Sequence, residues 1–529
     1  MLTPTRLLAV AALAATTLAV APAASSAPAT GHGHRATVVQ LTAAAACRES
    51  AAVASAGALQ VDAGLRLWRL GPGLAGTIVP ALRARGDLVF AQPERRYRVA
   101  ATTDTPDPLQ ADEWWLSQIG IDGLTPPGPG VPITIVDSGL DVSHPEFAGR
   151  ADTLTLNTQE PAGVGGEHGT SVASVIAAPL NGVGLVGIYP RALLRSWDAA
   201  KGDGTQLEST EIASGILAAA RAGRTVINLS LGSDASDLPI QLAVDEAVAS
   251  GSLVVAAAGN DGDRGSPLGY PAAYPHVTTV GATDKSGNVA SFSSRSHFVD
   301  LVAPGTDITV ASALSKTWRP ASGTSFSSPM VAAAAAWVWT ARPNLTAGQV
   351  AEILRRSARD LPPAGRDSAS GFGILNVAAA LALPAPIADP YEPNDDIDQV
   401  SPTGDRYVAK APPLTTTTRR ATRILGRVDA YEDPRDVYRV WLPAWQRFSA
   451  TLTSSSDGDL ALYASSAPSV VGRYATTGRL GIASTRGTTE RLAYANGKRG
   501  RWAYVVVRLP STSLDATYQL RVTSAVTKR

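Results

Sequence analysis

A serine at the start of an apolar run is the first residue of this chain whose type and setting suit covalent chemistry. Ser325 follows Gly323-Thr324 and precedes the apolar stretch 331–339, so we expect it at the beginning of a helix. The first backbone N–H groups of a helix have no acceptor inside the helix, and such free donors suit an oxyanion. Serine also occurs at helix starts as an ordinary N-cap. Taken alone, this stretch favours the capping role.

Two upstream stretches supply the other parts of an acyl-transfer site. A serine hydroxyl becomes a good nucleophile when a base accepts its proton, and a histidine with a pKa of about 6.5 suits that role. His168 begins a predicted helix, and Asp137 ends an apolar strand. The carboxylate can fix the imidazole tautomer and stabilise the imidazolium. A helix cap and a turn would explain each residue singly, but the three together favour catalysis.

An alternation of strands and helices from residue 131 onward would position these side chains. Apolar, β-branched runs predict strands at 131–136, 193–197, 225–229 and 253–258, and helical stretches follow at 171–178, 212–222 and 240–250. This pattern predicts an α/β fold with a doubly wound parallel sheet covered on both faces. Ligands of such sheets bind beyond the carboxyl ends of the strands. Asp137 and Asn260 both follow strands, so both are expected at that edge.

The motifs of this region resemble those of the subtilisin family of serine proteases. The matching stretches are Asp137-Ser138-Gly139 with His144-Pro145-Glu146-Phe147, then His168-Gly169-Thr170, Ser230-Leu231-Gly232, Ala257-Ala258-Gly259-Asn260 and Gly323-Thr324-Ser325. They occur in the family's order, Asp then His then Ser, within residues 107–382. An α/β-hydrolase would have its serine first, within Gly-x-Ser-x-Gly, whereas position 327 here is serine.

The resemblance implies a role for each matching residue. Ser325 would be the nucleophile, His168 the general base and then acid, and Asp137 the orienting carboxylate. Asn260 would donate its side-chain amide to the oxyanion beside the backbone N–H of Ser325, with a turn asparagine as the alternative. Two segments would bind an extended polypeptide substrate by strand addition. They are Gly202-Asp203-Gly204 and Ser230-Leu231-Gly232.

The resemblance also implies a structural Ca²⁺ ion, although the chemistry itself requires no cofactor. Residues 179–185 match in length the family loop that wraps this ion, and oxygen ligands suit a hard cation. The expected ligands are the Asn181 side chain, the Glu146 carboxylate, and the carbonyls of Pro179, Val183 and Leu185. A surface turn is the alternative for this loop. His144, His276 and His297 have no companion at ligand spacing, so we expect structural or solvated roles for them.

The N-terminal part of the chain predicts export and a separate small domain. Arg6, the apolar stretch 7–21 and the small residues after it are typical of a signal peptide over residues 1–27, with an uncleaved anchor as the alternative. Residues 28–104 show the strand and helix periods of a small α+β domain, and a Pro- and Thr-rich linker follows. The resemblance implies a pro-segment that inhibits the enzyme intramolecularly and is released near residues 98–106. An N-terminal domain that stays attached is the alternative.

The peptidase-like region, residues 105–383, is followed by a proline-rich, acidic boundary. Residues 387–529 then alternate in the manner of an antiparallel β-sandwich. Within them, Tyr391-Glu392-Pro393-Asn394-Asp395 and Asp436-Val437-Tyr438 resemble the pre-peptidase C-terminal domain found behind secreted proteases. A passive spacer and a domain that binds substrate or a surface are equally open.

Composition narrows the partners and the compartment. The net charge of +1 over 529 residues shows no basic surplus, so a nucleic-acid partner is not expected. The single cysteine, Cys47, excludes an intramolecular disulfide. We expect a secreted, extracellular, monomeric protein with polypeptide substrates and no membrane contact in its mature form. A serine endopeptidase acting through an acyl-enzyme is favoured, and the alternative is a catalytically idle binding protein with a subtilase fold.

Overall fold

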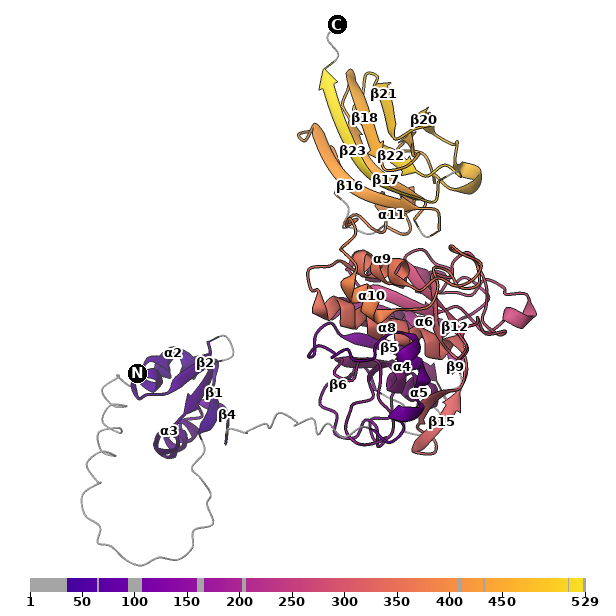
Figure 1. Cartoon of the computed structure of the whole chain (residues 1–529). Helices are drawn as coiled ribbons and strands as arrows, with labels where there is room; N and C mark the ends of the chain where they lie inside the picture. Colours follow the sequence, from indigo (N-terminus) through magenta and orange to yellow (C-terminus); the bar gives the residue numbers. More distant parts are fainter. Residues whose placement is uncertain are drawn as a thin grey trace, which may run out of the picture. The chain divides into compact units, whose positions relative to one another are not determined.

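The computed structural model describes residues 36–63, 66–93, 107–158, 166–201, 206–407, 412–431, 433–511 and 513–526. The chain forms two compact units, Met1–Ala101 and Thr102–Arg529 (Figure 1). The predicted signal peptide (1–27) and the predicted release region of the pro-segment (98–106) lie outside the described residues. In the part that is described, no helix has both the length and the hydropathy needed to cross a membrane.

The first unit is a four-stranded antiparallel sheet with two helices. Its elements are β1 (Thr37–Leu41), α2 (Ala43–Ser55), β2 (Leu59–Asp62), β3 (Leu67–Leu70), α3 (Pro72–Ala84) and β4 (Leu88–Pro93), and the strand order is β2-β3-β1-β4. Thr42 caps α2 by accepting the N–H of Ala45. Strands β1 and β3 share one core with both helices, made of Val39, Leu41, Ala45, Val53, Trp68, Leu70, Ala75 and Leu82.

The second unit contains a seven-stranded sheet that confirms the predicted parallel arrangement. Its strands are β5 (Ile133–Asp137), β6 (Thr153–Thr155), β7 (Leu194–Asp198), β10 (Val226–Leu229), β11 (Leu253–Ala257), β12 (Val277–Thr283) and β13 (Leu301–Pro304). They lie in the order β13-β12-β11-β10-β5-β7-β6, and neighbouring strands pair in parallel. Asp137 is the last residue of β5, so its side chain stands at the carboxyl edge of the sheet.

Helices cover this sheet on both faces. One face carries α6 (Ser209–Arg221) and α7 (Leu238–Ala249), and the other carries α5 (Glu167–Ala177), α8 (Thr324–Ala341), α9 (Ala347–Ser357) and α10 (Val377–Ala382). Alternate strand residues therefore enter different cores: Val226 packs with α8, whereas Ile227 packs with α6 and α7. This burial on both faces explains the nearly continuous apolar runs of the strands.

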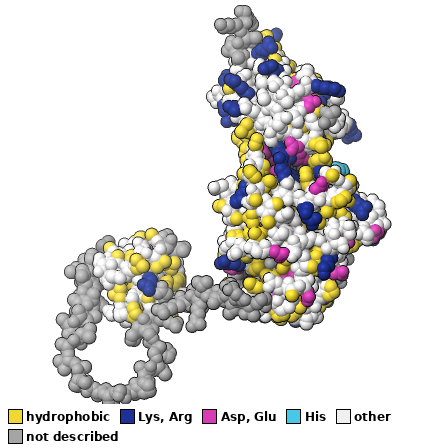
Figure 2. All heavy atoms as spheres, viewed as in Figure 1, with side chains coloured by type: hydrophobic (Ala, Val, Ile, Leu, Met, Phe, Trp, Pro, Cys, Tyr) yellow, Lys and Arg dark blue, Asp and Glu magenta, His cyan; other side chains and the backbone are white. Residues whose placement is uncertain are grey.

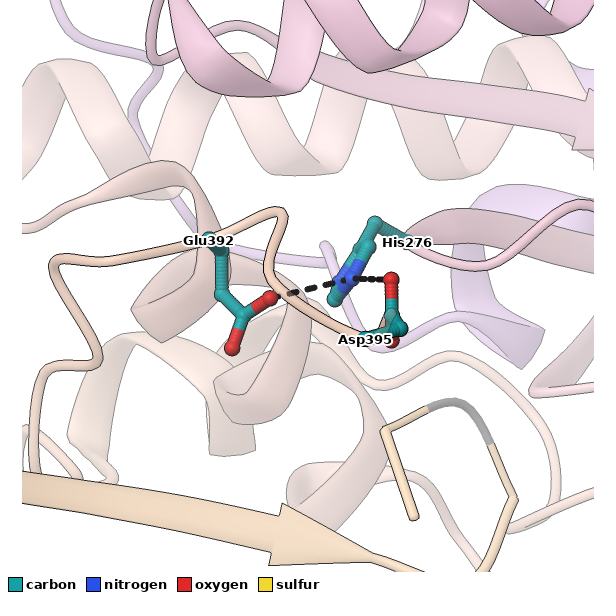
Figure 3. Close-up of side chains that lie close together, drawn as sticks. All are labelled: His276, Glu392 and Asp395. Carbon is teal, nitrogen blue, oxygen red and sulfur yellow. Dashed lines mark hydrogen bonds and ion pairs between the residues drawn. The ribbon is translucent and has the colours of Figure 1, made fainter. Parts of the chain in front are cut away.

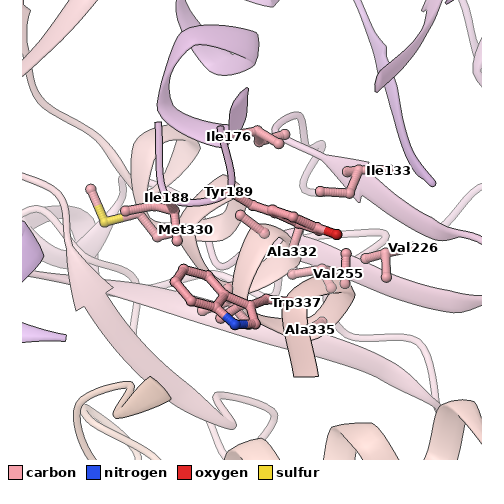
Figure 4. Close-up of a cluster of buried hydrophobic side chains, with 14 of the residues drawn as sticks. Ile133, Ile176, Ile188, Tyr189, Val226, Val255, Met330, Ala332, Ala335 and Trp337 are labelled. Atoms are coloured by element: carbon pink, nitrogen blue, oxygen red, sulfur yellow. The ribbon is translucent and has the colours of Figure 1, made fainter. Parts of the chain in front are cut away.

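Helix α8 lies at the centre of one of these cores. Its residues from Met330 to Val338 are buried on all sides, as is typical of a helix enclosed by a domain core. Figure 4 shows Met330, Ala332, Ala335 and Trp337 of α8 among side chains from neighbouring strands and helices. The position of Ser325 at the start of α8 is thus fixed by extensive packing behind it.

Short elements complete the peptidase-like part. They are η1 (Gln110–Asp112), α4 (Trp114–Gln118), β8 (Ala200–Lys201), β9 (Gln206–Leu207), η2 (Gly262–Arg264), β14 (Ile308–Ser312) and β15 (Thr317–Ala321). Strands β14 and β15 form an antiparallel hairpin that leads into α8.

The remaining chain forms two four-stranded antiparallel sheets. Their elements are α11 (Ile397–Val400), β16 (Ala421–Asp429), β17 (Arg435–Leu442), β18 (Gln446–Ser454), β19 (Asp459–Ala464), η3 (Gly472–Tyr474), β20 (Arg479–Ala483), β21 (Thr489–Ala495), β22 (Arg501–Arg508) and β23 (Asp515–Val526). The orders are β16-β23-β18-β21 and β17-β22-β19-β20. Side chains from both sheets, such as Phe448 of β18 and Val505 of β22, form one core. Figure 2 shows basic and acidic side chains together where these sheets meet the peptidase-like part.

Candidate active site

The structure brings Asp137 and His168 into direct contact. Nδ1 of His168 lies 2.8 Å from Oδ1 and 3.0 Å from Oδ2 of Asp137, whose side chain is 1% exposed. The imidazole is 40% exposed, so one ring nitrogen faces a buried carboxylate while the ring stays accessible. A carboxylate on Nδ1 selects the tautomer that leaves Nε2 free to accept a proton.

Close approach of α5 to the end of β5 makes this contact possible. Gly169 follows the histidine, and a Cβ at this position would lie 2.0 Å from the carbonyl oxygen of Gly139. The N–H of Gly169 also donates to Oγ of Ser138 at 3.1 Å. Glycine at 169 is therefore needed for His168 to reach Asp137.

Neighbouring charges set the protonation of the histidine. Burial opposes its charged form, but the carboxylate of Asp137 outweighs burial and raises the pKa of His168 above its ordinary value. Glu167 and Arg319 form an ion pair of 3.0 Å beside it, and their effects on the imidazole oppose each other. The sequence analysis did not identify this pair, because Arg319 lies on the β14–β15 hairpin, far from Glu167 along the chain.

Ser325 is the second residue of α8 and is half-buried. Its hydroxyl donates to the carbonyl oxygen of Ser230 at 3.3 Å. The next residue, Phe326, has its ring 6.0 Å from the imidazole of His168, between ring centroids. The serine thus lies in the neighbourhood of the histidine, with its hydroxyl turned to a main-chain acceptor. Catalytic hydrogen bonds of this kind often form only when substrate binds.

Asn260 is held at the same helix start. Its Oδ1 accepts the backbone N–H of Thr324 at 2.9 Å and the hydroxyl of Thr324 at 3.0 Å. Because the oxygen faces these donors, the NH₂ group points away from them, and Nδ2 lies 3.4 Å from where a Cβ on Gly323 would be. The amide and the first-turn N–H of Ser325 are therefore two donors at one end of α8.

The two predicted substrate segments have different outcomes. Ser230, Leu231 and Gly232 directly follow β10, and the hydroxyl of Ser230 donates to the carbonyl oxygen of Ser325 at 2.8 Å. This bond ties the segment to the helix that carries the serine. Gly202, Asp203 and Gly204 lie outside the described residues, between the short paired strands β8 and β9.

The predicted calcium loop gathers acidic side chains, including two that the sequence analysis missed. Oε2 of Glu146 accepts from Nε1 of Trp318 at 2.6 Å, whereas its Oε1 is buried without a hydrogen-bond partner. Oδ1 of Asn181 accepts the N–H of Val183 at 2.9 Å. Asp107 accepts the N–H groups of residues 181–183 through Oδ1, and its Oδ2 is buried and unpartnered. Pro179 and Leu185 lie at the two ends of the loop.

Burial dominates the electrostatics of this loop. It raises the pKa of Glu146 to about 8 and that of Glu113, which accepts the N–H of Val186, to about 9. Buried carboxylate oxygens without hydrogen-bond partners are of the ligand type that a hard divalent cation prefers. Asp107 lies at the start of the second unit, before its first helix. This position was the only sign in the sequence that Asp107 could belong to the site.

Comparisons with known proteins show which proteins this chain is similar to. A family model described as "Subtilase family" matches residues 128–373. Subtilisin DY of Bacillus licheniformis is 39% identical over 257 residues, which cover 48% of this chain and 91% of that protein. Subtilisin amylosacchariticus of Bacillus subtilis subsp. amylosacchariticus is 38% identical over 257 residues, and the match spans 66% of that protein, slightly less than two thirds. A solved structure titled "S41 Psychrophilic Protease" has 29% identity, covers 53% of this chain and 100% of that one, and gives a TM-score of 0.44.

Proposed function

Because this chain belongs to the subtilase family, we propose that it is a serine endopeptidase that hydrolyses peptide bonds through an acyl-enzyme intermediate. The observation that carries this proposal is the 2.8 Å contact between Nδ1 of His168 and the buried carboxylate of Asp137, beside the helix that begins with Ser325. Such a contact would fix the tautomer of the base, and the start of α8 would supply the hydroxyl nucleophile.

The proposed mechanism uses the described side chains in sequence. Nε2 of His168 takes the proton of Ser325 while Oγ attacks the substrate carbonyl, and Asp137 stabilises the imidazolium. The negative charge on the carbonyl oxygen is stabilised by Nδ2 of Asn260 and the backbone N–H of Ser325. The imidazolium then gives its proton to the leaving amine as the C–N bond breaks. Water, deprotonated by His168, hydrolyses the acyl-enzyme and restores the serine.

Labelling of the serine separates this function from the idle-fold alternative. A serine-directed phosphonate should add once to the folded, processed protein, and the labelled peptide should contain Ser325. Purified Ser325→Ala should bind no label and should cleave an unfolded protein about a million times more slowly, as in subtilisin itself. Retained cleavage by Ser325→Ala would reject the assignment, and an unlabelled, folded wild type would favour a binding protein.

The substrate is proposed to be an extended polypeptide. Ser230, Leu231 and Gly232 form one side of its binding strand, and the segment Gly202-Asp203-Gly204 would form the other. Main-chain hydrogen bonds would supply affinity, whereas pockets for alternate side chains would supply selectivity. The bond from Ser230 to the carbonyl of Ser325 supports this placement, because it keeps one strand in register with the nucleophile.

A Ca²⁺ ion is proposed in the loop 179–185, with a structural role. Glu146, Asn181 and the main-chain oxygens of Pro179, Val183 and Leu185 would hold it, and the structure adds Asp107 as a candidate ligand. The unpartnered Oε1 of Glu146 and Oδ2 of Asp107 support this proposal. The ion would stabilise the loop and take no part in the reaction.

The full chain is proposed to be a secreted, monomeric zymogen. The sheet-and-helix unit that ends near residue 101 would inhibit the enzyme until Ser325 releases it near residues 98–106. Residues 387–529 would be an accessory domain of the pre-peptidase C-terminal type. Wild type and Ser325→Ala, expressed without other proteases, should differ in mass by the released segment. If both keep it or both lose it, self-processing is wrong.

A further inference from the structure

A cluster of side chains whose types can bind metal lies outside the candidate active site, where the C-terminal sheets meet the peptidase-like part. Figure 3 shows His276 pointing at Glu392 and Asp395. Nε2 of His276 lies 3.1 Å from Oε2 of Glu392 and 3.1 Å from Oδ2 of Asp395. The histidine directly precedes β12, whereas the two carboxylates belong to the segment that enters the C-terminal sheets. The group was not predicted from the sequence because the two carboxylates lie 116 and 119 residues after the histidine.

The three side chains are enclosed, and the histidine is held in a strained backbone conformation. Their exposed fractions are 13% for His276, 16% for Glu392 and 9% for Asp395. His276 has a φ of 61°, in the left-handed region that non-glycine residues rarely adopt. Such strain persists where surrounding structure requires it and concentrates at functional sites.

Buried polar atoms without hydrogen-bond partners occur in the same part of the chain. Asn394, between Glu392 and Asp395 in the chain, donates its N–H to the Glu392 carboxylate, yet its fully buried side-chain amide has no hydrogen-bond partner at Oδ1 or Nδ2. Oε1 of Glu392 and Oδ1 of Asp436 are likewise buried, and these two carboxyl groups are close enough to hydrogen-bond to each other. Native proteins rarely leave buried oxygens unpaired, and an ion is one explanation for a group of them.

The nearby guanidinium groups make their direct contacts with other carboxylates, although Arg406 also acts on Asp395 at longer range. Arg406 binds Asp245 through two contacts of 2.7 and 2.8 Å, and Arg427 binds Glu352 at 2.9 Å. Asp389 and Asp436 each have a carboxylate oxygen within 4.8 Å of a carboxylate oxygen of Glu392, so several acidic groups lie close together. The cluster therefore gathers several acidic groups around one imidazole, which is a composition that metal sites use.

A cavity of about 310 Å³ opens onto the cluster. The cavity lies between the peptidase-like part and the C-terminal sheets. Residues of both parts line it, including His276, Glu392, Asp389 and Asp433. The space is large enough for an ion together with bound water, and it gives an ion a path to the ligands.

We propose that His276, Glu392 and Asp395 bind one divalent transition-metal ion, such as Zn²⁺, that joins the C-terminal sheets to the peptidase-like part. Ligand atoms at about 2.0–2.1 Å from a tetrahedral Zn²⁺ are about 3.3 Å apart, close to the two separations of 3.1 Å. The imidazole nitrogen favours such an ion over Ca²⁺, which prefers oxygen ligands. Water from the cavity would complete the coordination.

Metal content of stripped and reloaded protein tests this proposal independently of peptidase activity. The full chain carrying Ser325→Ala is treated with a chelator, dialysed, and titrated with Zn²⁺, and bound metal is measured by mass spectrometry. One equivalent should bind tightly to this parent protein. His276→Gln and Asp395→Asn should each weaken binding at least tenfold. His297→Gln, which changes an exposed histidine outside the cluster, should bind as the parent does.

A second measurement reports the proposed joining of the two parts. Zn²⁺ should slow cleavage of the segment 384–391 by an added protease in the parent and in His297→Gln, but not in His276→Gln, with far-ultraviolet circular dichroism confirming that each variant is folded. Binding of Ca²⁺ alone, unchanged by His276→Gln, would overturn the proposal. So would the absence of any bound metal, which would leave an imidazolium paired with two carboxylates.

Discussion

At the scale of single residues, the protonation of His168 controls the proposed reaction. The base must be neutral to accept the serine proton, and the Asp137 carboxylate raises the pKa of His168 despite burial. Cleavage of an unfolded protein should therefore rise with pH through that pKa and then level off, with its acid limb above that of an ordinary histidine. Initial rates at saturating and at low substrate, from pH 5 to pH 10, measure this limb.

Replacement of the carboxylate provides the control for this pH profile. Asp137→Asn removes the carboxylate charge that raises the pKa of His168, whereas burial, which lowers this pKa, remains. The acid limb should move to lower pH, and turnover should fall by about ten-thousandfold because the tautomer is no longer fixed. An unmoved limb in this variant would mean that another group controls the profile.

The proposed oxyanion donor, Asn260, can also be tested by a single substitution. Asn260→Ala should lower kcat by about a hundred- to a thousandfold, as loss of this donor does in subtilisin, with little change in KM. The reason is that Nδ2 contacts the carbonyl oxygen only when negative charge develops there. Because Oδ1 of Asn260 also accepts two hydrogen bonds from Thr324, the thermal midpoint must be measured alongside the kinetics. A loss confined to KM would contradict the role.

At the scale of elements, the approach of α5 to β5 is what assembles the pair. Gly169→Ala would place a methyl group 2.0 Å from the carbonyl oxygen of Gly139, where no atom fits, so α5 must move. A displacement of about 1 Å in catalytic geometry costs about a hundredfold in rate. We expect kcat to fall at least that much in Gly169→Ala. The matched variant Gly348→Ala, also in the first turn of a helix, meets no atom within 4 Å, and its kcat should fall far less.

The loop 179–185 gives a second prediction for an element. Removal of Ca²⁺ by a chelator should lower the thermal midpoint of the purified enzyme, since an ion at a hundred times its Kd adds about 2.7 kcal/mol, or about 5–10 °C. In a His276→Gln background, which lacks the proposed Zn²⁺ site, Ca²⁺ should restore the midpoint and Zn²⁺ should not. Glu146→Gln should lose most of this response, whereas Asp234→Asn, an exposed control, should keep it. If the chelator left the thermal midpoint unchanged, the loop 179–185 would hold no Ca²⁺.

The elements also show what the sequence could and could not predict. Strand β11 was predictable because it is buried on both faces and is an unbroken apolar run, and β10 interrupts such a run only at Asn228. Strand β12, with the sequence Val-Thr-Thr-Val-Gly-Ala-Thr, is equally buried, but its threonines hide that pattern. Asp107 and the partners of His276 were missed for another reason, since contacts between distant segments have no local period.

At the scale of the whole molecule, charged pairs hold the C-terminal sheets against the peptidase-like part. Asp245 of α7 binds Arg406 through two contacts, with exposed fractions of 6% and 16%. Arg356 of α9 binds Asp515 of β23 at 2.8 Å, but both side chains are 43% exposed. Buried and exposed pairs at one junction should contribute very differently, because water screens the second pair.

This contrast gives a prediction for the junction. Asp245→Asn removes the carboxylate that is hydrogen-bonded to the guanidinium of Arg406 and leaves it only the longer-range attraction of Asp398 and Asp395, so the free energy of unfolding should fall by up to about 3–5 kcal/mol. Asp515→Asn should cost less than about 1 kcal/mol. Urea denaturation of the full chain carrying Ser325→Ala measures both, and cleavage of the segment 384–391 by an added protease shows whether the junction opens first. Equal effects of the two substitutions would mean that the junction is held by its apolar contacts, and the charged pairs would then serve only to align the two parts.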